Sequence, residues 1–382
     1  KFLGKKFFDL GQRDLYDFMK FFTVSVGDFL DEFFESDLIK AHKAGSAVVG
    51  TNLGPRSPGT AYVLLHHYMG DVDGAVGAWG FPRGGMGSVS GALAGALQEH
   101  GGEIRINAGV DKIMVKRGKV TGVRLENGEE ILADRVVSNV DAKKTFLGLM
   151  EPEDAGEKVV KAAKRYKSRG SSGKLNIALN GVPEFTALPK GSELIKGDFH
   201  IVDNMESYER GYDEWKDGMW STNPYLDILI PTLTDPTMAP PGKHFMTCFV
   251  QYCPAKVKGQ DWNADLLKKF GDNVINSIAK YSPNFKDLIE HVEIRSGQVI
   301  DNEIGLTDGN IFQGELSLNQ LMFNRPFHGC AQYRGPVNGL YLSGSTTHPG
   351  GGVMGAPGAN SAREILMDMK ISTTVPEDEG DD

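Results

Sequence analysis

Residues 340–358 (LYLSGSTTHPGGGVMGAPG) place a short apolar strand, a turn with six glycines and the start of a helix in direct succession. The helix is predicted over residues 359–369, because Ala362, Ile365, Leu366 and Met369 recur at helical spacing. Glycines let the backbone approach a ligand closely, and the unpaired N–H groups at a helix start favour phosphate or a polarised ring carbonyl. The stretch therefore predicts a site for a flat, anionic ligand.

The glycines of this stretch carry a specific expectation about substitutions. We expect larger residues at Gly350, Gly351 and Gly355 to be tolerated poorly. A Cβ atom there would enter the space of the ligand or require an unfavourable positive φ.

This stretch resembles the C-terminal flavin-binding signature of phytoene-desaturase-like FAD oxidoreductases, in the amine-oxidase-type superfamily. The motif that carries the resemblance is Leu-Tyr-Leu-x-Gly-x-x-Thr-His-Pro-Gly-Gly-Gly-Val-x-Gly. The segments at residues 29–37, 57–67, 84–87 and 309–316 are similar to the same relatives. The resemblance implies FAD as cofactor and leaves open whether this chain retains it. It implies cofactor contacts from Val110, Gly84, Gly85, Gly344, Ser345, Thr347, His348, Pro349, Gly350, Gly351, Gly352, Val353, Met354 and Gly355.

Such flavoproteins begin with a strand, a G-x-G-x-x-G turn and a helix that hold the ADP half of FAD. This sequence opens instead with helical patterning over residues 15–33, and Ser25 with Asp28 indicates a capping box that starts a second helix. The glycines of residues 85–91 match the fingerprint poorly. We therefore expect a fragment or a shortened relative of a longer flavoprotein.

The rest of the chain predicts an α/β protein with α+β character. Its architecture is expected to be the FAD/NAD(P)-binding flavoprotein fold without its first strand-turn-helix, with an inserted substrate domain of antiparallel sheet plus helices. A β-meander is expected over residues 104–140, with turns at residues 117–119 and 127–128. The expected segments are 1–80 (helical, substrate side), 81–150 (flavin domain with meander), 151–300 (substrate domain), 301–372 (flavin-domain closing segment) and 373–382 (disordered acidic tail).

The net charge, apolar runs and cysteine content of the chain limit its binding partners and its cellular compartment. A formal charge of −9 argues against nucleic acid as a general partner, and no run reaches the ~18 apolar residues that a membrane span needs. The phenylalanine-rich N-terminal helix face leaves peripheral membrane contact open, beside packing on the protein body. Three cysteines are too few and badly spaced for a zinc site or a disulfide framework, which favours a reducing compartment, the cytoplasm or alternatively the mitochondrial matrix.

Catalytic residues are not identified by any acid–base motif, which a flavin reaction does not require. His66 and His348 are the candidates. His66 and His67 with Asp71 and Asp73 could hold a metal, but neighbouring histidines on a strand point in opposite directions, and we expect no metal site.

Two functions remain open. The first is hydride transfer to or from an apolar, conjugated or long-chain substrate by a fragment of an FAD-dependent oxidoreductase. The second is a non-catalytic module that binds an apolar ligand or a protein partner without FAD. Exposed sheet edges predict self-association or a second covering chain. The aromatic residues between positions 208 and 225 could line an apolar cavity or pack in the core.

Overall fold

The computed structural model describes residues 9–371, so the expected acidic tail at 373–382 lies outside the described residues. The chain forms two compact units. Unit 1 comprises Lys1–Arg105 and Arg169–Ile311, and unit 2 comprises Ile106–Ser168 and Phe312–Asp382. Each unit is therefore built from two separate stretches of sequence.

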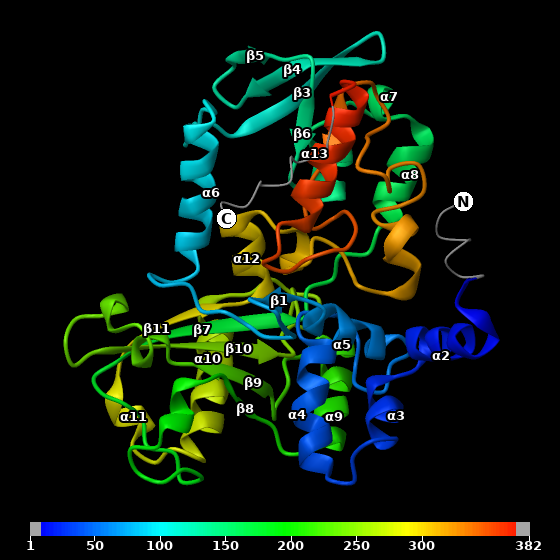
Figure 1. Ribbon diagram of the computed structural model, residues 1–382. Helices are drawn as coiled ribbons and strands as arrows, with labels where there is room; N and C mark the ends of the chain where they lie inside the picture. Colours follow the sequence, from blue (N-terminus) through cyan, green and yellow to red (C-terminus); the bar gives the residue numbers. More distant parts are fainter. Residues whose placement is uncertain (1–8, 372–382) are drawn as a thin grey trace, which may run out of the picture. The chain divides into compact units, whose positions relative to one another are not determined.

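Unit 1 is organised around a five-stranded antiparallel sheet with the order β11-β7-β10-β9-β8 (Figure 1). One face of the sheet carries the alternating apolar residues of β7, β9 and β10, which pack with α10 in a single core. The opposite face carries Tyr225, which packs with residues of α4 and α9 in a second core. The strands are β7 (Ser172–Leu179), β8 (Phe199–Ile201), β9 (Tyr225–Leu229), β10 (His244–Gln251) and β11 (Ile289–Arg295).

The helices of unit 1 begin at side chains that accept backbone N–H groups. Ser25 accepts from Asp28 N at the start of α3, as its capping box predicted, and Ser36 and Asn263 cap α4 and α10. The helices are α2 (Gly11–Thr23), α3 (Val26–Asp31), α4 (Asp37–Val48), α5 (Thr60–Tyr68), α6 (Gly87–Glu99), α9 (Met205–Lys216), α10 (Ala264–Ala279), α11 (Phe285–Leu288) and α12 (Gly297–Ile304). A small hairpin, β1 (Asp71–Val72) and β2 (Ala75–Val76), follows α5.

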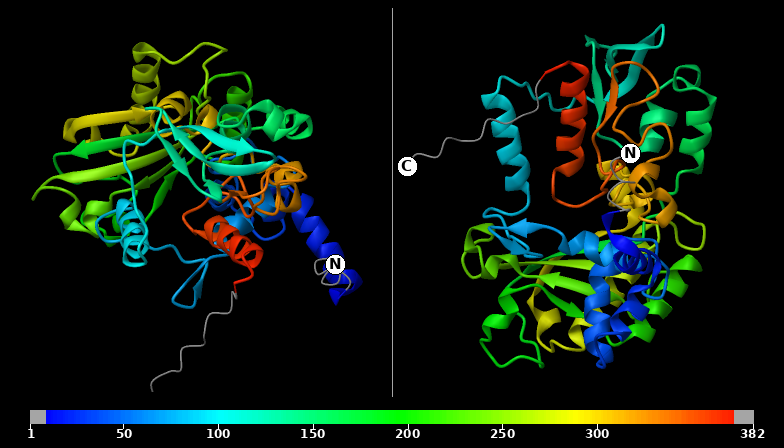
Figure 2. Two further views of the ribbon diagram at one scale, coloured as in Figure 1. Left: turned by 90° about the horizontal axis from the view of Figure 1, so that it is seen from above. Right: turned by 45° about the vertical axis from the view of Figure 1, so that its right-hand side comes forward.

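Unit 2 contains the expected meander, formed by β3 (Val110–Lys116), β4 (Lys119–Leu125) and β5 (Glu130–Leu132). Figure 2 shows it as a twisted antiparallel ribbon. A separate parallel pair joins β6 (Val136–Ser138) to β12 (Leu340–Leu342). The remaining regular elements of unit 2 are η1 (Lys144–Gly148), α7 (Pro152–Ala155), α8 (Glu157–Arg165), η6 (Leu318–Gln320), η7 (Met322–Asn324) and α13 (Ala356–Asp368).

Several elements differ from the sequence-based expectation. Residues 66 and 67 lie in helix α5, so the strand expected there is wrong. Strand β11 ends at Arg295, because Ser296 caps α12 by accepting from Val299 N. Helix α13 begins at Ala356, three residues before the predicted start. Among residues 9–371, no helix combines the length and apolar character needed to cross a lipid bilayer.

Candidate functional site

The glycine-rich loop of residues 343–355 starts directly after β12 and ends at α13. Three of its glycines have positive φ: Gly350 (112°), Gly352 (136°) and Gly355 (66°). Gly355 is the N-cap of α13, and no side chain caps this helix. Pro357 has no N–H, so the first turn offers the N–H groups of Ala356 and Gly358 without a competing side-chain acceptor, which suits an anionic or carbonyl oxygen.

Arg325 holds the loop in place by donating hydrogen bonds to backbone carbonyl groups. Its guanidinium is fully buried and donates to Ser345 O from Nε at 3.0 Å and from Nη2 at 2.7 Å. Nη2 also donates to Phe312 O at 2.6 Å and to Gly314 O at 3.3 Å. Nη1 donates to Glu315 O and to Gln320 O. One side chain thus ties the glycine-rich loop to the segment that follows Ile311.

A second set of contacts comes from Gln313 and Tyr333, which both have positive φ (55° and 61°). The Gln313 amide donates to Asn139 O at 3.0 Å and accepts from Thr346 N at 3.1 Å. The Tyr333 hydroxyl donates to His348 O at 2.8 Å. Positive φ is costly for residues other than glycine, so both are held in strained conformations at the loop that they support.

The glycines of the loop lie in two different environments, one packed against the protein and one open. A Cβ on Gly351 would lie 2.2 Å from the Phe312 ring, and one on Gly344 would lie 2.5 Å from Asn139 O. A Cβ on Gly351 is thus excluded by the protein itself, and a contact of Gly351 with the cofactor stays a prediction. A Cβ on Gly355 or Gly358 would meet no atom within 4 Å. The open side of the loop is thus at the start of α13.

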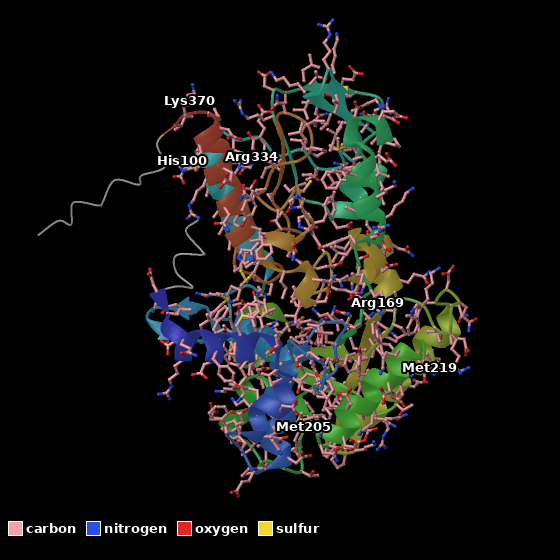
Figure 3. All side chains as sticks on the ribbon, turned by 90° about the vertical axis from the view of Figure 1, so that its right-hand side faces the viewer. His100, Arg169, Met205, Met219, Arg334 and Lys370 are labelled. Carbon is pink, nitrogen blue, oxygen red and sulfur yellow. The ribbon has the colours of Figure 1, made fainter. Side chains whose placement is uncertain are left out.

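Helix α13 is itself anchored on β12. The Arg334 guanidinium pairs with Glu364 and lies 2.9 Å from an Asp368 oxygen, and the Tyr341 hydroxyl donates to Asp368 at 2.9 Å. Figure 3 shows Arg334 beside this helix. Pairing with Arg334 and Tyr341 lowers the pKa of Asp368 to about 2. These contacts join the C-terminal half of α13 to the strand.

The remaining candidates of unit 2 belong to this loop, except Val110, which lies in the meander. Val110 opens β3, where it pairs with Leu125. Thr347 is buried and its hydroxyl donates to Gly344 O. His348 is joined to Pro349 by a cis peptide bond, and Val353 and Met354 are exposed. Because Ser345 O and Thr347 serve contacts within the loop, the accessible backbone runs from Gly352 to the start of α13.

Gly84, Gly85 and His66 belong to unit 1 instead. Gly84 N donates to Asp235 Oδ2 at 2.6 Å, and a Cβ on Gly85 would lie 2.9 Å from Met238 Cε. His66 is buried in α5. Within the described part of the chain, His66 and His67 do not form a metal-ligand group with Asp71 and Asp73.

His67 is a neutral histidine at neutral pH. Burial lowers its pKa from 6.5 to about 4, and its Nδ1 contacts Val63 O at 2.9 Å. The unfolded chain takes up a proton near pH 6.5 and the folded chain only near pH 4, so stability is lost as pH falls through this window. We expect the unfolding free energy of the wild type to fall by roughly 3 kcal/mol between pH 7 and 4, relative to His67→Gln. Urea unfolding at each pH measures it, and parallel curves for the two proteins would contradict it.

The aromatic residues of positions 208–225 pack in cores. Tyr208, Trp215 and Tyr225 are buried, and Tyr208 stacks on Tyr225 with ring centroids 4.9 Å apart. Trp220 contacts Trp262 and Phe270. The packing alternative describes Tyr208, Trp215 and Tyr225, and an apolar cavity beside the half-buried Trp220 stays a prediction.

Sequence reasoning missed Arg325 and Tyr333, and it identified Gln313 only within a family segment. Arg325 contacts backbone carbonyls, which carry no sequence signal. The positive φ of Gln313 and Tyr333 also leaves no sequence signal, because glycine or asparagine would be the expected residue there. The site offers backbone donors and a rigid frame rather than an acid–base pair, which fits a group such as FAD that brings its own reactive ring.

The family model described as "Flavin containing amine oxidoreductase" matches residues 6–211. Pyridine nucleotide-disulfide oxidoreductase domain-containing protein 2 of Rattus norvegicus is 38% identical over 91% of this chain and 61% of its own length. The lycopene-forming phytoene desaturase of Pseudescherichia vulneris is 28% identical over 90% of this chain and 66% of its own length. The chain thus spans under two thirds of the length of either relative.

A solved structure of a putrescine oxidase triple mutant has a TM-score of 0.54 at 14% identity, covering 92% of this chain and 69% of the other. At this identity the likeness concerns the fold alone. The mixed α/β chain thus shares its fold with this putrescine oxidase.

Proposed function

Because the chain belongs to the flavin-containing amine oxidoreductase family, we propose that it forms part of an FAD-dependent oxidoreductase that transfers hydride to or from an apolar, conjugated or long-chain substrate. The proposal rests on the start of α13, which follows Gly355 and has no side-chain cap. A Cβ on Gly355 would meet no atom within 4 Å, so there is space for a ligand beside it. Bound FAD would supply the hydride-accepting ring.

The residues of this chain would then bind and orient the cofactor. Backbone N–H groups at the start of α13 would donate to its polar oxygens, as helix starts do for phosphates and ring carbonyls. Gly352 and Gly355 would let the backbone approach the ligand. Arg325, Gln313 and Tyr333 would keep the loop in its binding conformation, so that little ordering entropy is lost on binding.

Gly355→Asn tests the placement of the cofactor. Asparagine tolerates the left-handed conformation of Gly355 (φ 66°), and the side chain enters space that is open in the structure. We expect FAD affinity to fall about tenfold or more, the equivalent of roughly 1.4 kcal/mol, with the fold intact. Fluorescence titration with FAD measures the affinity.

Gly118→Asn is the matched control. Gly118 also has positive φ (74°) and an open Cβ position, in the β3–β4 turn of the same unit. Its substitution should leave FAD affinity unchanged. Equal affinity of Gly355→Asn and Gly118→Asn would place the cofactor elsewhere.

The substrate class rests on the phytoene desaturase relative, whose named substrate is an apolar polyene. Anaerobic mixing of the FAD-loaded protein with candidate electron donors tests it, because loss of the visible flavin absorbance reports hydride transfer. We expect reduction by apolar compounds with allylic or conjugated C–H groups and none by putrescine. Reduction by the diamine alone would overturn the apolar substrate.

A further inference from the structure

Three ionisable side chains meet on one face of the unit 1 sheet. Asp198 and His200 are two residues apart at edge strand β8, so their side chains lie on the same face. The register pairs His200 with Asp227 of β9, which brings the third side chain to that face. His200 Nε2 lies 3.3 Å from Asp198 Oδ2 and 3.7 Å from Asp227 Oδ2.

His42 of α4 contacts the opposite side of the His200 ring. The two Nδ1 atoms are 2.8 Å apart, and the ring centroids are 4.6 Å apart. A contact of this length requires one N–H donor and one lone pair. When His200 Nδ1 donates to His42 Nδ1, the lone pair of His200 Nε2 faces the two carboxylates. A histidine that ligates a metal commonly has this arrangement, with its second nitrogen held by a neighbouring group.

The charges of the cluster are not balanced by basic side chains. The carboxylate oxygens of Asp198 and Asp227 that face His200 lie within 4.8 Å of each other. Within residues 9–371, the ion-pair contacts of both are with His200 and none is with a lysine or arginine. Two neighbouring carboxylates repel one another unless a proton or a cation lies between them. The His200 side chain is 9% exposed and that of Asp227 33%, so the cluster is sheltered but open on one side.

We propose that Asp198 Oδ2, His200 Nε2 and Asp227 Oδ2 bind a zinc ion, with water as the fourth ligand and His42 as a positioning residue for His200. The three ligand atoms lie within 4.8 Å of one another. Zinc bound to oxygen and nitrogen at about 2.0–2.1 Å in a tetrahedron places its ligands roughly 3.4 Å apart. Small side-chain rotations therefore suffice to form the site.

No metal site was expected from the sequence, and neither the cysteines nor His66 and His67 enter this one. The ion would join β8 to β9 and, through His42, to α4. This inference does not depend on the proposed flavin chemistry, since every residue of the cluster belongs to unit 1 and the glycine-rich loop belongs to unit 2.

Calorimetric titration of the metal-stripped chain with zinc chloride tests the site. We expect one zinc ion per chain, at least 100-fold weaker binding by His200→Gln and Asp227→Asn, and 10- to 100-fold weaker binding by His42→Gln, the range found for residues that support a ligand. His291→Gln is the control, because His291 is an exposed histidine on strand β11 at the other edge of the same sheet.

Substitution by cobalt gives an independent readout. The tetrahedral ion absorbs visible light strongly, and the spectrum should disappear in His200→Gln but persist in His291→Gln. Circular dichroism verifies the fold of each variant, and His42→Gln keeps all three ligands should the ligand variants unfold. The proposal is overturned if the wild type binds no zinc at micromolar concentrations, or if His42→Gln and every folded ligand variant bind zinc with wild-type affinity, as an adventitious surface ion would.

Discussion

Arg325→Met is expected to destabilise the protein by about 4 kcal/mol. The substitution removes the donors to five buried or partly buried carbonyl groups, those of Phe312, Gly314, Glu315, Gln320 and Ser345. A hydrogen bond from a charged donor contributes about 1.5–3 kcal/mol, and a buried acceptor left without a partner costs about 1–3 kcal/mol. The estimate is lower than a simple sum, because neighbouring carbonyls relax together.

Urea unfolding measures this loss, and Arg363→Met is the matched control. Arg363 is exposed on α13, where it donates to Asn360 Oδ1. Its substitution should change stability by less than about 0.5 kcal/mol. Arg325→Lys should lie between the two, because an ammonium group cannot reach carbonyls in several directions at once. Equal stability of Arg325→Met and Arg363→Met would show that the network does not hold the loop.

Gln251→Leu should cost about 3 kcal/mol in unit 1. Gln251 is fully buried at the end of β10. Its amide donates to Val48 O at 2.8 Å and to Thr51 O at 3.1 Å, and its carbonyl accepts from Gly50 N at 2.9 Å. Leucine would leave Gly50 N and Thr51 O, two buried groups of the loop after α4, without these partners, while Val48 O keeps its hydrogen bonds from Thr51.

The exposed Gln260 gives the control, since Gln260→Leu removes no buried side-chain contact of this kind. Differential scanning calorimetry of the two variants compares their effects directly. A melting temperature for Gln251→Leu within error of that for Gln260→Leu would mean that the loop finds other partners, water included.

Local chemistry explains most of what the sequence predicted correctly. The capping contact of Ser25 with Asp28 forms at the predicted helix start. The turn at Asn127 and Gly128 joins two strands of the meander, with Gly128 at a φ of 88°. Each of these features is determined by residues a few positions apart, so a short window contains the whole signal.

Long-range contacts explain what sequence reasoning missed. Helix α5 was mistaken for a strand because apolar or aromatic residues also occupy its exposed positions, Leu65 and Tyr68, and leave no helical periodicity. Arg325 could not be distinguished from a surface arginine, because its partners are backbone carbonyls. Asp198, His200 and Asp227 meet only through the register of β8 with β9. Neither the burial of a side chain nor the register of a sheet is readable from one sequence.

FAD binding through the glycine-rich loop and the start of α13 is the property on which the proposed function depends. It is tested by the visible absorbance of the purified chain, residues 1–382, during titration with FAD and removal of unbound cofactor. We predict the perturbed absorbance bands of one protein-bound flavin per chain. A colourless protein that leaves the FAD spectrum unchanged at concentrations up to about 1 mM would instead favour a module that binds an apolar ligand or a protein partner without FAD. That result would contradict cofactor binding by this chain.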